Sequence, residues 1–148
     1  MNSSQRSNLD FSGTRLEELS SDSVLEVMQE KTDEESASKY VLIKHDFYSS
    51  DSDHGRELLA DFISALCDAS YKSIIVYLIG KGTRLLDESN PLHDEMLRLT
   101  ERSEMVIAAS ESVAFYEVNV PDNNKITEQS SRSIAEDIIF IPDLLILE

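Results

Sequence analysis

One stretch of the sequence decides the fold, and it reads Glu104-Met105-Val106-Ile107-Ala108-Ala109-Ser110-Glu111-Ser112-Val113-Ala114-Phe115-Tyr116. It opens with a short, largely apolar run, which is typical of a strand buried on both faces. Two serines and a glutamate then suit the start of a helix, and apolar residues follow for the helix itself. Ligands gather beyond the carboxyl ends of the strands in open α/β sheets. We therefore expect Ser110 and Ser112 to line any site in this protein.

The alternation of strands and helices extends from Tyr40 to the end of the chain. Residues 73–79 give the strongest strand signal, a continuous apolar run that suits a central parallel strand. Further strands are expected at residues 40–44, 104–109 and 144–147, with a brief one at Ile126, and helices at residues 54–69 and 83–87, after Pro91 and after Thr127. This order predicts an α/β fold with three layers and a mainly parallel sheet of about five strands.

Local patterns predict how the helices begin and which faces they bury. Asp53 is expected to cap the helix at residues 54–69, whose apolar face consists of Leu58, Leu59, Phe62, Ile63, Leu66 and Cys67. Thr127 is expected to cap the last helix, whose buried stripe consists of Ile134, Ala135, Ile138 and Ile139. His93 stands among acidic residues and is expected to be a solvated surface side chain.

Residues 1–39 are expected to form an acidic, largely disordered tail. The segment is rich in serine, glutamate and aspartate, and Phe11 is its one aromatic residue. Leu16, Leu19, Val24 and Val27 fall on one side of a helical wheel, so an amphipathic helix is expected near residues 14–28. The chain is thus divided into a tail at residues 1–39 and an α/β domain at residues 40–148.

Composition and charge exclude several classes of function. The formal net charge of the 148 residues is −16 at pH 7, and such a surface repels phosphate backbones and anionic lipids. No apolar run approaches the roughly 18 residues of a membrane span, and the N-terminus lacks the pattern of a signal peptide. We expect a cytoplasmic protein that binds neither nucleic acid nor membranes.

The sequence offers few groups for metal or redox chemistry. Cys67 is the single cysteine, so no intrachain disulfide can form, and the scattered His45, His54 and His93 do not complete a zinc set with it. Cys67 falls on the apolar face of its helix, where a small buried hydrophobe is a better interpretation than a reactive thiol. No metal ion and no cofactor are expected.

Three short sequence matches and the order of the strands and helices give this chain a resemblance to a known family. The matches are Val41-Leu42-Ile43, Gly55-Arg56-Glu57-Leu58-Leu59 and Phe115-Tyr116. Over roughly residues 40–147, the chain resembles the DsrE/DsrF-like sulfur-relay family, and most of all the DsrE-like C-terminal domain of YedF-type proteins linked to selenium or sulfur metabolism. Those domains place a cysteine four residues before the tyrosine of the Phe-Tyr pair, and Ser112 stands there in this chain.

The resemblance implies a role without the family's usual chemistry. Members with the cysteine resemble carriers that hold sulfur as a persulfide, which a serine hydroxyl cannot form. Related assemblies include subunits without the cysteine that act as structural partners, and oligomers are usual. We interpret the chain as a non-catalytic binding or partner subunit, for which a protein partner or self-association is expected. Two alternatives stay open, a sulfur carrier that uses Cys67 and a small-anion-binding protein.

Candidate pocket residues follow from their positions at strand ends. They are His45, Asp46, Gly80, Lys81, Gly82, Ser110, Ser112 and Tyr116. Two glycines around a lysine suit an anion cradle, but a plain turn is the better interpretation because the full phosphate-binding loop is missing. No catalytic residue is assigned. The only support for a catalytic Ser-His-Asp set of Ser112, His45 and Asp46 is that their loops are expected at the same edge of the sheet.

Overall fold

The structure is a computed structural model that describes residues 37–148. The predicted helix at residues 14–28 and nearly all of the predicted tail lie outside the described residues. The strands are β1 (Ser38–Ile43), β2 (Ser73–Leu78), β3 (Met105–Ala109), β4 (Ile126–Gln129) and β5 (Leu145–Leu147). The helices are α2 (Asp53–Asp68), α3 (His93–Arg102), α4 (Ser110–Phe115) and α5 (Ser131–Ile138), with the 3-10 helix η1 (Gly80–Leu86). β1 begins slightly before the predicted residue 40.

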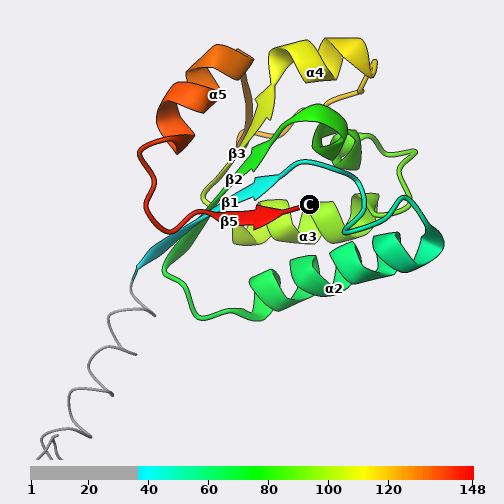
Figure 1. The fold of residues 1–148 in the computed structure, drawn as a ribbon, viewed down its shortest axis with the longest axis horizontal. Coiled ribbons are helices and arrows are strands. Elements are labelled where there is room, and N and C mark those ends of the chain that lie inside the picture. The colour runs from blue at the N-terminus through cyan, green and yellow to red at the C-terminus, as the bar shows by residue number, and fades with distance from the viewer. Residues whose placement is uncertain (1–36) are drawn as a thin grey trace, which may run out of the picture. The chain divides into compact units, whose positions relative to one another are not determined.

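The strands form a five-stranded sheet in the order β4-β3-β2-β1-β5, and every neighbouring pair is parallel. β2 lies at the centre, where the apolar run of residues 73–79 places it, and Ile74, Val76 and Leu78 are fully buried. Helices α2 and α3 lie on one side of the sheet and α5 lies on the other, whereas α4 follows directly from the end of β3 (Figure 1). The predicted α/β class, the layers and the parallel sheet are therefore confirmed.

The two sides of the sheet are covered unequally. On the α2 and α3 side, buried residues of the helices, such as Leu59 and Met96, pack against Val41 and Val76 in the larger core cluster. On the α5 side, the smaller cluster of buried residues consists of Leu42, Tyr77, Ile107, Ala109 and Ile134. The helix α5 has eight residues, and Ile134 is the buried residue that it adds to this cluster. The sheet therefore has one deep apolar layer and one thin layer.

Two predicted capping residues are wrong. Ser52 caps α2, since its Oγ accepts the N–H of Gly55 at 3.0 Å, and the predicted Asp53 is the first helical residue. Ser130 caps α5 by accepting the N–H of Ser133 at 3.1 Å. The predicted cap Thr127 instead pairs with Ile107 of β3. Thr127 is β-branched, and its strand pairing outweighs its preference for a helix start.

The predicted apolar stripe of the last helix is only partly buried. Ile134 is buried and Ile138 is half-buried, but Ala135 and Ile139 are exposed. α5 ends at Ile138, so Ile139 lies beyond the part of the helix that packs on the sheet. On α2, Leu59, Ile63 and Leu66 are buried as predicted, whereas Phe62 is exposed.

The residues Gly80-Lys81-Gly82, predicted as a plain turn rather than an anion site, open the 3-10 helix η1. This helix also absorbs the short helix predicted at residues 83–87. Gly80 has a positive φ of 55°, which favours glycine. A Cβ on Gly82 would collide with the carbonyl oxygen of Ile43. The glycines therefore allow η1 to approach the end of β1 closely.

Gly55 provides a test of the packing between α2 and the loop before it. Gly→Ala in an exposed helix stabilises a protein by about 1 kcal/mol. A Cβ on Gly55 would collide with the carbonyl oxygen of Ser50, so we expect Gly55→Ala to lower the free energy of unfolding by about 1–3 kcal/mol. Urea denaturation checks this, with Asp61→Ala on the exposed side of α2 as the control. A stabilised Gly55→Ala protein would contradict this packing.

Candidate functional site

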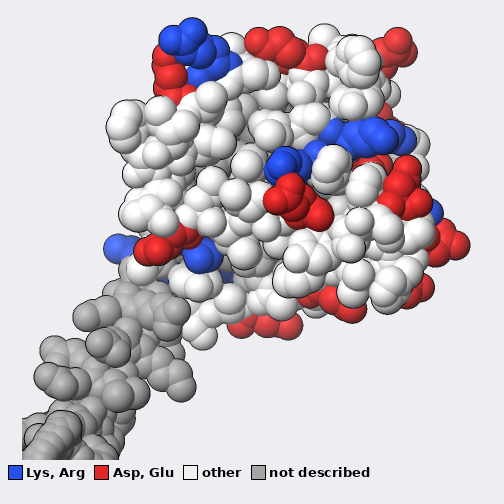
Figure 2. Space-filling model, viewed as in Figure 1, with Lys and Arg blue, Asp and Glu red and all other residues white. Residues whose placement is uncertain are grey.

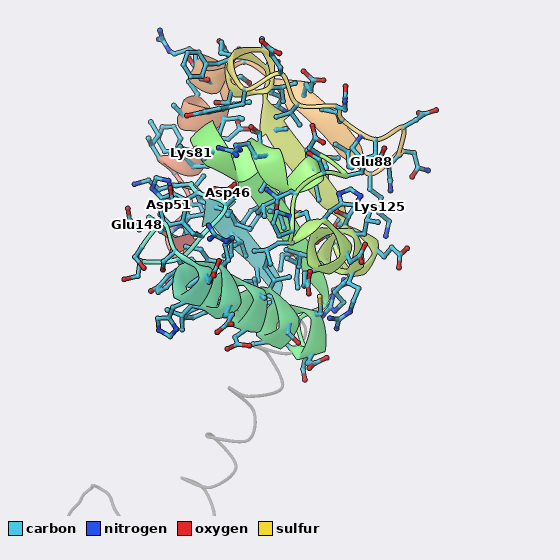
Figure 3. The ribbon with its side chains drawn as sticks, turned by 90° about the vertical axis from the view of Figure 1, so that its right-hand side faces the viewer. Asp46, Asp51, Lys81, Glu88, Lys125 and Glu148 are labelled. Carbon is cyan, nitrogen blue, oxygen red and sulfur yellow. The ribbon has the colours of Figure 1, made fainter. Side chains whose placement is uncertain are left out.

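Three loops meet beyond the carboxyl ends of β1, β2 and β3, and they carry the predicted site residues. His45 and Asp46 follow β1, Gly80, Lys81 and Gly82 open η1 after β2, and Ser110, Ser112 and Tyr116 form or end α4. The three strands are parallel neighbours, so these residues come to one edge of the sheet. Figure 3 looks onto this edge and labels Asp46 and Lys81.

Ser112 ties two of these loops together. Its Oγ accepts the backbone N–H of Gly80 at 2.9 Å and so joins the start of η1 to α4. The N–H of Gly82 is also engaged, because it donates to the carbonyl of Ile79 at 2.9 Å. α4 starts without a side-chain cap, so the predicted capping of this helix by Ser110 or Ser112 is wrong. The Ser112 hydroxyl serves as a structural acceptor, and the glycine N–H groups are not left free for an anion.

A cleft of about 670 Å³ lies at the same edge. Its lining comes from the loop after β1, the start of α2, η1 with the segment after it, and the end of α4. Asp46 and Tyr116 line it, as predicted for pocket residues, and the other predicted residues do not. Arg84, Asp87 and Glu117 also line it and were not predicted.

Asp46 is at the centre of a network that links three loops. Its side chain is 13% exposed, and its Oδ2 lies 3.5 Å from Nε of Arg84. The same oxygen accepts Nδ2 of Asn90 at 3.2 Å. The guanidinium of Arg84 also lies over the ring of Tyr116, 5.9 Å from the centroid. Together these contacts hold the loop after β1, η1 and the end of α4 around the cleft.

The cleft carries more carboxylates than guanidinium groups. Its acidic residues are Asp46, Asp51, Asp53, Asp87 and Glu117, against Arg56 and Arg84. Arg56 donates to Asp51 at 3.2 Å and to Asp53 at 2.8 Å, and Arg84 is paired with Asp46. Both cations are therefore already neutralised. The balance of charge repels small anions, so the electrostatics of the cleft do not favour the anion-binding alternative.

Hydrogen bonds keep two carboxylates at this edge ionised. Asp87 accepts the N–H of Asn119 and the N–H of Ser89, each at 3.0 Å, together with the Ser89 hydroxyl at 2.8 Å. These bonds, the one from Asn119 above all, hold the pKa of Asp87 below its ordinary value. The N–H of Ser131 donates to Glu111 at 2.8 Å and likewise lowers the pKa of that carboxyl. Glu111 thereby satisfies the first N–H of α5, the helix that Ser130 caps, although its place in the sequence suggested α4.

His45 and Lys81 lie outside the cleft, against one aromatic ring. His45 stacks on Phe47 with ring centroids 4.7 Å apart and 12° between the planes. Nζ of Lys81 lies 5.9 Å from the centroid of Phe47. Nδ1 of His45 is buried without a hydrogen-bond partner, and no hydrogen bond in residues 37–148 joins His45 to Ser112. The geometry therefore does not support a Ser-His-Asp set.

His93 is a further correction. It is half-buried as the first residue of α3, and its Nδ1 is buried without a hydrogen-bond partner. The side chain is therefore only partly solvated, whereas a solvated surface side chain was expected. Leu92, directly before it, is buried in the larger core cluster and draws the start of α3 inward.

Cys67 lies at the end of α2 that is farther from the cleft. α2 starts at the carboxyl edge and returns to the amino ends of the strands, and Cys67 stands in its last turn. The thiol is free and half-buried. Burial is the main cause of its raised pKa, with a further contribution from Asp68 and opposition from Arg98 and Arg102. A raised pKa makes the reactive thiolate scarce at neutral pH.

No group of three or more His, Cys, Asp or Glu side chains in residues 37–148 is arranged to hold a metal ion. Within the same residues, every helix is too short or too polar to cross a membrane.

The fold matches two solved structures. A conserved protein of unknown function from Bacteroides thetaiotaomicron, BT1422, aligns with a TM-score of 0.52 at 16% identity, over 74% of this chain and 95% of that chain. The ychN protein from E. coli, of the DsrE/DsrF-like family, aligns with a TM-score of 0.51 at 14% identity, over 74% of this chain and 99% of that chain. No protein-family model and no curated protein matches the sequence. The chain therefore has a DsrE-like fold.

Removing the Ser112 hydroxyl tests its structural role. Ser112→Ala leaves the N–H of Gly80 without its acceptor, so we expect the free energy of unfolding to fall by about 1 kcal/mol. We also expect faster hydrogen exchange at the Gly80 amide. Denaturation and amide exchange measure both effects, and Ser110→Ala is the control because Ser110 makes no such bond between the loops. Unchanged exchange at Gly80 in Ser112→Ala would contradict the role.

The lowered pKa of Asp87 predicts how the stability of the protein depends on pH. Its folded-state pKa is lowered, so its bonds stabilise the protein at neutral pH and that contribution is lost as the pH falls through the folded pKa. NMR titration of the carboxyl carbon is expected to give a midpoint below the roughly 3.9 of an unperturbed aspartate. Ser89→Ala removes one donor and should raise the midpoint. An ordinary midpoint in the unmodified protein would show that these bonds do not form.

Proposed function

We propose that this chain is a non-catalytic protein of the DsrE-like class, similar to YedF-type domains, which serves as a binding or partner subunit in sulfur or selenium metabolism. The observation that carries the proposal is the state of Ser112. The resemblance assigns the sulfur-carrying cysteine to this position, but the residue here is a hydroxyl held by the N–H of Gly80 at 2.9 Å. No persulfide can form on that oxygen.

The position of Cys67 also supports a non-catalytic role. A sulfur carrier needs an accessible thiolate, and this thiol is half-buried on α2 with a raised pKa. It also stands at the opposite end of α2 from the cleft. Sulfur bound there would not reach the loops at the carboxyl edge.

The role is that of a protein that works through association. A subunit without its own chemistry contributes by binding a partner or another copy of itself. Phe115, Ile139 and Phe140 are large apolar side chains that lie exposed in this structure, and such side chains are common in contact surfaces. We propose a cytoplasmic protein whose partners are neither nucleic acid nor membranes, since its net charge of −16 repels both kinds of polyanion.

Sulfur transfer provides the test. After incubation of the purified protein with a polysulfide donor, intact-mass spectrometry is expected to show no added sulfur at residue 112 and only a minor addition at Cys67. Ser112→Cys is expected to gain sulfur, because the Gly80 N–H and the first turn of α4 would stabilise a thiolate there.

The matched control is the double variant Ser112→Cys with Cys67→Ser, which confines the gained sulfur to position 112. A stoichiometric persulfide on Cys67 in the unmodified protein, lost in Cys67→Ser with an unchanged circular dichroism spectrum, would overturn the non-catalytic role.

A further inference from the structure

The α5 side of the sheet is left partly uncovered at the β5 edge. Ile146 pairs with Leu42 in the parallel register of β5 and β1, so both side chains lie on the same side of the sheet. Leu42 is buried beside Ile134 of α5, whereas Ile146 is 45% exposed. In the segment that joins α5 to β5, Ile139 is 71% and Phe140 is 81% exposed. We call Ile139, Phe140 and Ile146 the apolar patch.

The apolar patch is continuous with the thin core on this side. Ile141 and Leu144, which stand between its members in the sequence, pack against the core cluster of Leu42 and Ile134. Figure 2 shows an area over the end of α5 and the segment after it, at the left of the view, with charged side chains only at its margins. Exposed apolar side chains that extend a core in this way are typical of a surface covered by a partner.

Two exposed carboxylates without ion pairs in the described part of the chain stand next to the apolar patch. Asp137 stands at the end of α5, where it adds to the effect of burial in raising the pKa of Tyr77 on the same side of the sheet. Asp137 and Asp143 are exposed, and neither forms an ion pair within residues 37–148. One cation, Lys39, also lies beside this segment, but it forms no ion pair with either carboxylate within residues 37–148. Its Nζ donates to the carbonyl of Asp143 at 3.2 Å and lies 5.8 Å from the centroid of Tyr71, which packs in the α2 and α3 layer.

From these features we propose that the apolar patch docks a partner protein whose contact segment carries apolar side chains flanked by lysine or arginine. The inference rests on the proposed role as a partner subunit. Apolar side chains of the partner would cover Phe140 and Ile146, and its cations would meet Asp137 and Asp143. A second copy of the chain fits less well, because two copies of net charge −16 would bring the same carboxylates together. β5 is an edge strand, so an extended segment suits this position.

The probe is a synthetic eight-residue peptide of alternating valine and lysine, titrated into the full-length protein and followed by NMR. We expect saturable shifts centred on residues 139–147. Phe140→Ser is expected to weaken binding at least about tenfold, as for a central aromatic anchor. Phe115→Ser is the matched control, because Phe115 on α4 is 77% exposed, and it is expected to change binding less than about twofold.

Charge is tested separately. Asp137→Asn combined with Asp143→Asn is expected to weaken binding by at least about threefold, whereas Glu57→Gln combined with Asp61→Asn, which removes the same charge from α2, is expected to leave it nearly unchanged. Equal binding of a serine and lysine peptide would show nonspecific attraction by net charge and would overturn the proposal. All variants alter exposed side chains, and circular dichroism checks that each is folded.

Two other outcomes would also overturn this docking surface. One is a set of shifts confined to the carboxyl-edge cleft, which would leave the proposed role as a partner subunit intact. The other is a dimer in light scattering that Phe140→Ser abolishes, which would identify a second copy as the occupant. Failure of the proposed function has a different signature, since it requires stoichiometric sulfur on Cys67.

Discussion

The structure depends on the need of a parallel sheet to bury both of its faces. β1, β2 and β3 are apolar on both sides, so each side requires a covering layer of helices. α2, α3 and η1 provide a deep layer on one side, whereas α5 provides mainly Ile134 on the other. The helices that connect parallel strands also send every strand-to-helix loop to one edge. The way the helices cover the sheet therefore accounts both for the cleft at that edge and for the apolar patch on the thin side.

At the carboxyl edge, the hydroxyl of Ser112 is a structural group that links two loops. The Oγ of Ser112 accepts the Gly80 N–H with the ordinary length of a neutral hydrogen bond. A thiolate in the same place would use that N–H, together with the start of α4, to stabilise its charge. A hydroxyl would need a base before it could act as a nucleophile, and His45 instead stacks on Phe47. The same geometry therefore joins η1 to α4 in this chain.

The sequence predicts those features that depend on patterns along the chain. The run at residues 73–79 identifies the central strand because only a doubly buried strand is apolar throughout, and Ser112 and Tyr116 are placed correctly at the end of β3 by their order. Ser52 and Ser130 were missed as caps because a residue of similar capping preference stands close to each in the sequence. These residues are Asp53 beside Ser52 and Thr127 three residues before Ser130. Arg84 and Asn90 were missed because they meet Asp46 from a distant segment, and no local signal announces such a contact. The predicted residues therefore gather at one edge of the sheet, but only Asp46 and Tyr116 among them line the cleft.

Charge and apolar surface would have separate roles in the proposed binding of a partner. The two arginines of the cleft are paired with neighbouring carboxylates, so neither is available to bind an anion. The net charge attracts any basic protein, but salt limits the reach of this attraction to about 8 Å, and it does not distinguish one part of an acidic surface from another. Burial of an exposed aromatic such as Phe140 depends on shape and on removal from water, which are local properties. In the proposed interaction, charge would therefore bring a basic partner to the surface, and the thin side of the sheet would decide where it binds.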